Sequence, residues 1–83
     1  ALSDLGSGAN GNIGIGMSAG SGITTGDNYT VVGQYAGNGF TYTGSNITLI
    51  GYEAEASSAA ATNEITLGDA NVFQQVYLVQ KRI

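Results

Sequence analysis

The acidic residues are the main candidates for acid–base or metal chemistry in this chain. The sequence has six Asp and Glu residues and neither His nor Cys, which excludes imidazole catalysis, thiol chemistry and zinc sites built from those ligands. Glu53 and Glu55 are expected to share one strand face, and Glu64 and Asp69 follow in the next stretch. Two carboxylates ~5–9 Å apart are what glycoside hydrolysis requires. The other reading, that exposed acids keep a weakly charged chain soluble, is favoured because the chain is short.

Two further patterns have a chemical reading. The stretch 14–20 contains Gly14, Gly16 and Gly20 like a dinucleotide-binding loop, but that fingerprint needs a following helix, and no helical period follows. Asp27, Asn28 and nearby carbonyls are oxygen donors of the kind that Ca²⁺ prefers, yet their spacing matches neither an EF-hand nor a glycine–aspartate calcium repeat. We therefore expect no metal, no cofactor and no enzymatic activity.

Composition narrows the classes of partner. A chain of 83 residues forms at most one domain and buries only about 60% of its unfolded surface. The net charge is −4, and the only cations are Lys81 and Arg82, so we expect no nucleic-acid partner. No apolar stretch approaches the ~20 residues of a membrane-spanning helix, so we expect no membrane insertion.

Short segments of the chain repeat one pattern, in which a turn residue and four strand-like residues precede a glycine. Clear copies end at Gly33, Gly51 and Gly68, and a degraded copy ends at Gly16, so the glycines lie 17, 18 and 17 residues apart. A fixed period this short is typical of stacked coils. The sequence therefore predicts an all-β fold, a parallel β-roll or β-solenoid of about four coils of 17–18 residues.

Equivalent positions of the repeats have separate predicted roles. An Asn column is expected at the turn before each strand, the glycine column at its end, and a branched or Leu residue just before the glycine. Alanines three residues after the glycine fit a crowded inner corner. These columns are Asn28, Asn46 and Asn63; Gly16, Gly33, Gly51 and Gly68; Ile15, Val32, Ile50 and Leu67; and Ala19, Ala36 and Ala54.

The two faces of the middle strands are both apolar, which is unusual for a strand with one solvated face. Residues alternate between faces along a strand, so Val31 and Leu49 lie opposite the Val32 and Ile50 face. We expect Val31 and Leu49 to form an exposed apolar stripe, extended by tyrosines. Such stripes mark association sites, so the sequence predicts a homo-oligomer.

The chain divides into three segments. Residues 1–9 are an approach segment in which Leu2 and Leu5 could plug the end of the first coil, residues 10–71 form the repeat domain, and residues 72–83 form a C-terminal strand or tail without glycine.

The repeated phrase Gly-(Asp/Ser)-Asn-x-Thr-x-(Val/Ile)-Gly-x-x-Ala resembles repeats of two groups of extracellular fibrous proteins. One group is the head of YadA-like trimeric autotransporter adhesins. The other is the distal tail fibre of bacteriophages, where runs similar to 46–54 and 63–72 occur. The 17–18-residue unit is longer than the adhesin repeat and favours the fibre. The resemblance implies an intertwined homotrimer.

The function implied by the resemblance is structural and receptor-binding. A segment of a trimeric viral tail fibre, located in the virion, would mediate attachment to a host cell-surface glycan or outer-membrane protein. The loops 20–25, 37–43 and 55–61 would form the variable outer surface. The alternatives are a bacterial adhesin head at the cell surface, a polysaccharide-degrading enzyme of the tailspike type, and a plain spacer. The candidate receptor contacts are Tyr35, Tyr42, Tyr52 and Phe40.

Overall fold

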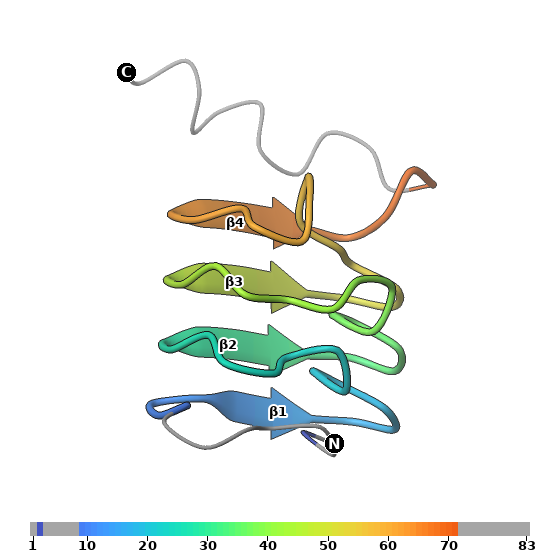
Figure 1. Ribbon diagram of the computed structural model, residues 1–83. Coiled ribbons are helices and arrows are strands. Elements are labelled where there is room, and N and C mark those ends of the chain that lie inside the picture. The colour runs from blue at the N-terminus through green and yellow to red at the C-terminus, as the bar shows by residue number, and fades with distance from the viewer. Residues whose placement is uncertain (1, 3–8, 72–83) are drawn as a thin grey trace, which may run out of the picture.

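The computed structural model describes Leu2 and residues 9–71, and within that part it contains four strands and no helix. The strands are β1 (Ile13–Ile15), β2 (Tyr29–Val32), β3 (Ile47–Ile50) and β4 (Glu64–Leu67). They form one parallel sheet in the order β1-β2-β3-β4 (Figure 1). The predicted all-β class is therefore confirmed, whereas the predicted tail 72–83 and most of segment 1–9 lie outside the described residues.

The register of the sheet follows the sequence repeat. Thr30 of β2 pairs with Thr48 of β3, and Thr48 pairs with Ile65 of β4. The connections between strands are also stacked, because Gly20 N–H donates to the Ala36 carbonyl at 2.7 Å and Gly37 N–H donates to the Ala54 carbonyl at 2.9 Å. Hydrogen bonds between successive repeats thus extend well beyond the strands. Figure 1 shows the connections stacked one above another in the same way as the strands.

The Asn and Gly columns form the two ends of the strands, and their backbone geometry explains their residue types. Asn28, Asn46 and Asn63 have φ of 62°, 60° and 57°, a left-handed conformation that Asn tolerates better than most residues. At the other end the four glycines also have positive φ, and Gly33 has φ of 133°. A Cβ on Gly33 would lie 2.6 Å from the Gly51 carbonyl oxygen, so the stacking of these corners requires glycine.

The inward face of the sheet is the one that we expected to be exposed. Val31 and Leu49 are fully buried, together with Tyr29 and Ile47 on the same face. The inward face meets a narrow interior, where a Cβ added to Gly37 would lie 3.2 Å from Leu49 Cδ1 and 3.3 Å from Val31 Cγ1. The expectation of an exposed Val31–Leu49 stripe is therefore wrong. The Val32 and Ile50 side chains point outward and are half-buried.

The connections supply the second wall of the core, which the repeat pattern did not predict. Ile23 and Tyr42 are fully buried and form a parallel bridge. The three predicted inner alanines are also fully buried; the connections bury Ala56 and Ala61 as well. At the N-terminal end of the stack, Leu2 packs against this core, and its N–H donates to the Ala19 carbonyl at 2.9 Å. The predicted plug is thus present at Leu2, and Leu5 lies outside the described residues.

Candidate functional site

The outer face of the sheet carries two rows of side chains, of which one is aliphatic throughout and the other has threonines in its two middle positions. Ile13 and Ile15 of β1 are 52% and 59% exposed, and Ile65 of β4 is 73% exposed. Between them the outward residues of the middle strands are two threonines and two branched aliphatics, all half-buried. Leu67 is half-buried at the far end. Since large aliphatic groups gain free energy when they leave water, this face is the strongest candidate for contact with another protein surface. We call it the outer sheet face: Ile13, Ile15, Thr30, Val32, Thr48, Ile50, Ile65 and Leu67.

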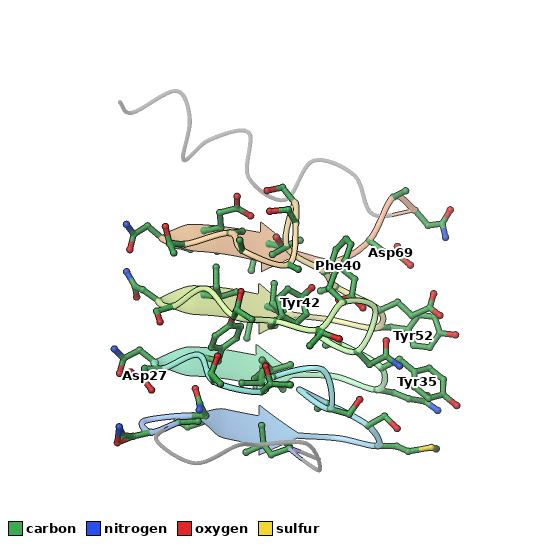
Figure 2. All side chains as sticks on the ribbon, viewed as in Figure 1. Asp27, Tyr35, Phe40, Tyr42, Tyr52 and Asp69 are labelled. Atoms are coloured by element: carbon green, nitrogen blue, oxygen red, sulfur yellow. The ribbon has the colours of Figure 1, made fainter. Side chains whose placement is uncertain are left out.

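A second candidate surface lies at the corner that follows the glycine column. Tyr35 and Tyr52 come from successive repeats, and their ring centroids are 6.2 Å apart with planes inclined by 56°. Tyr52 is 54% exposed and Tyr35 is half-buried. Figure 2 shows both side chains projecting from the same side of the stacked repeats, beyond the C-terminal ends of the strands, with Asp69 above them. This tyrosine corner, defined as Gln34, Tyr35, Tyr52 and Glu53, presents aromatic faces beside polar groups.

The backbone of this corner is left-handed at residues that do not favour that conformation. Ser18, Tyr35 and Glu53 occupy equivalent positions and have φ of 60°, 63° and 57°. The hydrogen bonds that stack the corner are made by backbone groups. Tyr35 N–H donates to the Met17 carbonyl at 2.9 Å, and Glu53 N–H donates to the Gln34 carbonyl at 3.0 Å. The side chains are therefore not required for stacking. The left-handed backbone conformation of Tyr35 costs on the order of 1 kcal/mol of strain. No feature of the repeat pattern predicted this second left-handed corner.

The loop 37–43 is fixed by one carboxylate. Glu55 Oε2 accepts from the N–H groups of Asn38 and Gly39 at 3.2 and 3.0 Å, and Glu55 Oε1 accepts from the Tyr42 hydroxyl at 2.5 Å. The Ala56 N–H donates to the same hydroxyl at 3.0 Å. The pKa of Tyr42 is raised above its ordinary value of 10, mainly by burial of the hydroxyl and to a smaller extent by its hydrogen bond to Glu55. Glu55 thus holds the loop against the next repeat.

The predicted receptor contacts separate into two groups. Tyr42 is fully buried, which corrects its assignment as a receptor contact: the hydroxyl is held by Glu55 and the ring lies inside the core. Phe40 is 40% exposed and packs edge-on against Tyr42 at 5.6 Å, so it is partly available at the surface. Tyr35 and Tyr52 lie on the surface, at the other end of the strands from Asp27 (Figure 2).

A buried tyrosine hydroxyl lies next to this cluster. The rings of Tyr29 and Tyr42 are 5.7 Å apart in an edge-to-face arrangement. Tyr29 is fully buried, and its hydroxyl has no hydrogen-bond partner among the described residues. Burial raises the pKa of Tyr29. This hydroxyl carries a desolvation cost of about 1–3 kcal/mol.

The carboxylates considered for glycoside hydrolysis do not form a shared strand face. Glu53 and Glu55 lie in a connection and not in a strand, because the chain turns at Gly51. Glu64 accepts two hydrogen bonds from Ser57, one from its N–H at 3.0 Å and one from its hydroxyl at 2.6 Å. These bonds lower the pKa of Glu64. Within the described residues no three acidic side chains gather to hold a metal ion. The Glu55 and Glu64 carboxylates therefore both fix loops.

Comparison with family models, with curated proteins and with solved structures finds no match. The described part of the chain also contains no helix long and apolar enough to cross a membrane.

Proposed function

We propose that the chain is a segment of a bacteriophage tail fibre, a parallel β-solenoid that assembles as a homotrimer and contributes to attachment at the host cell surface. The solenoid reading is supported by the hydrogen bonds that join the connections of successive repeats, in addition to the strands. The fibre reading rests on the resemblance of the 17–18-residue repeats. A trimeric autotransporter head is the closest alternative, and its shorter repeat makes it the weaker one.

The observation that carries the proposal is the outer sheet face. Burying a Leu or Ile side chain completely is worth about 1.5–3 kcal/mol, so covering the exposed half of Ile13, Ile15 or Ile65 gains on the order of 1 kcal/mol each. A parallel sheet is normally covered on both faces, and here only the inner face is covered by the described residues. A second and third copy of the chain would cover the outer face and remove these aliphatic groups from water.

Sedimentation equilibrium tests the assembly. The wild-type protein is expected to have the mass of three 8.4 kDa chains. The substitutions Ile15→Lys and Ile65→Lys place charges on the outer sheet face and are expected to dissociate the trimer. Thr41→Lys adds the same charge at an exposed loop position and serves as the matched control. A wild-type monomer, or a trimer that both outer-face variants leave intact, would contradict the proposal.

Attachment is tested separately on cells. Fluorescently labelled protein is expected to bind some bacterial strains in a panel and to reduce phage adsorption to those strains. A trimer that binds none of them would instead be a spacer.

A further inference from the structure

We propose that the tyrosine corner is a saccharide-binding site, and that its ligand is a neutral sugar such as a hexose or an N-acetylhexosamine. The inference deepens the proposed attachment function by naming the ligand class and the residues that contact it. It uses a surface separate from the outer sheet face.

The chemistry of the corner differs from that of the outer sheet face. The sheet face is aliphatic and β-branched, which suits close packing between protein surfaces. The corner presents two phenol rings, Tyr35 and Tyr52, with their hydroxyls, beside the exposed side chains of Gln34 and Glu53. Tyr rings provide a large apolar surface with a polar group at one end and few rotatable bonds. A sugar ring has matching properties, because its C–H faces are apolar and its edge carries hydroxyls.

The fold does not require aromatic residues at this corner. The two positions that follow the column glycine are Met17 and Ser18 in the first repeat and Asp69 and Ala70 in the fourth. The corner is stacked by backbone hydrogen bonds, from Tyr35 N–H to the Met17 carbonyl and from Glu53 N–H to the Gln34 carbonyl. Tyr35 is nevertheless kept at φ of 63°, where Asn or Gly would be less strained. A half-buried aromatic residue at a strained backbone position, next to the exposed ring of Tyr52, is therefore better explained by a contact with a ligand than by the needs of the fold.

The charge around the corner selects the ligand class. Glu53 is exposed beside the two rings, and Asp69 lies above them (Figure 2). The described residues contain no Lys or Arg. An anionic saccharide would be repelled by these carboxylates and would find no cation among the described residues to pair with, whereas a neutral saccharide meets aromatic faces and hydrogen-bonding groups.

The ring geometry defines how the saccharide binds. Because the ring planes are inclined by 56°, the two rings do not form one flat platform. The sugar stacks on the exposed face of Tyr52 and contacts Tyr35 with its edge. Gln34 and Glu53 are exposed neighbours of the two tyrosines in the chain. Their polar groups bond the sugar hydroxyls, and for Gln34 this bond replaces a 4.0 Å contact with Met17 Sδ.

The test is binding of the 83-residue chain to an array of neutral, sialylated and sulfated oligosaccharides, followed by titration of the binders with tyrosine fluorescence. Neutral oligosaccharides are expected to bind and anionic ones are not. Tyr52→Ala is expected to weaken binding about tenfold or more, as for a central aromatic contact. Thr41→Ala is the control, because Thr41 is an exposed residue of the loop 37–43 and is not part of the tyrosine corner.

A second variant separates a binding role from a structural one. Tyr35→Asn relieves the strained backbone, so it is expected to leave the melting temperature unchanged or higher while weakening saccharide binding. Loss of both binding and thermal stability in Tyr35→Asn would overturn the inference. So would unaltered binding in Tyr52→Ala, or an array on which no neutral saccharide binds.

The outcomes also distinguish this inference from the proposed function. A trimer that binds bacterial cells after periodate has oxidised their glycans would refute the saccharide site and leave the attachment function standing. Saccharide binding by a chain that sediments as a monomer would support the site and refute the fibre.

Discussion

Removing the hydroxyl from each of the two buried tyrosines, Tyr29 and Tyr42, is predicted to change the stability of the protein in opposite directions. Tyr29→Phe removes a buried hydroxyl that has no partner among the described residues, so we expect the variant to be more stable by about 1 kcal/mol. For a chain of this size that raises the melting temperature by about 4–8 °C. The core packing is retained, because the ring and its edge-to-face contact with Tyr42 remain.

Tyr42→Phe is expected to destabilise the protein strongly. It removes a hydrogen bond to the Glu55 carboxylate and leaves the buried Ala56 N–H without its acceptor. A bond to a charged group contributes about 1.5–3 kcal/mol and an unpaired buried amide costs about 1–3 kcal/mol. The sum is about 3 kcal/mol or more, which lowers the melting temperature by at least about 12 °C.

Calorimetry at one fixed protein concentration measures both variants, because the proposed assembly would make the melting temperature depend on concentration. A Tyr29→Phe protein that melts below the wild type would refute the reasoning, since its hydroxyl would then have a stabilising partner. Equal effects of the two substitutions would also contradict the assigned hydrogen bonds.

Three further predictions concern the backbone and pH. Gly33→Ala places a Cβ 2.6 Å from the Gly51 carbonyl oxygen at a φ of 133°. We expect the free energy of unfolding in urea to fall by about 3 kcal/mol or more, and to fall only slightly in the control Gly39→Ala. Equal losses in the two variants would contradict the stacked corner. The pKa of Glu64 is lowered, so its stabilising effect is present above the unfolded value of 4.5 and disappears as pH falls through the folded pKa. The drop of the melting temperature at acid pH should therefore be smaller in Glu64→Gln than in the wild type. An equal drop in both proteins would contradict the Ser57 bonds. The pKa values of Tyr29 and Tyr42 are raised, so the melting temperature should stay constant up to pH ~10 and fall above it. A wild-type melting temperature that does not fall above pH ~10 would contradict the burial of these two hydroxyls.

The sequence repeat predicts the strands and their register because each column has a local cause. Asn28 and Gly33 occupy positive φ at the ends of β2, and the residue types reveal this without knowledge of the rest of the chain. The direction of the sheet faces could not be predicted in the same way. Val31 and Val32 are both apolar, so alternation alone does not say which of them points inward.

The connections were harder to predict because their contacts are not periodic. Ile23 and Tyr42 form a bridge, but they lie seven and nine residues after the column glycines that precede them. Counting from the glycine therefore does not align them. The large apolar residues of the loops 20–25 and 37–43 were an available signal. The carboxylate of Glu55 binds a hydroxyl 13 residues earlier in the chain, and no local pattern indicates such a bond.

The most direct test of the central claim is chemical labelling of the outer sheet face. The natural chain has no cysteine, so Ile15→Cys and Thr41→Cys each provide a single site for maleimide. We predict that Ile15→Cys reacts much more slowly than Thr41→Cys at concentrations where the protein is associated, and that the two rates converge on dilution. Equal rates at every concentration would contradict the claim that copies of this chain cover the outer sheet face.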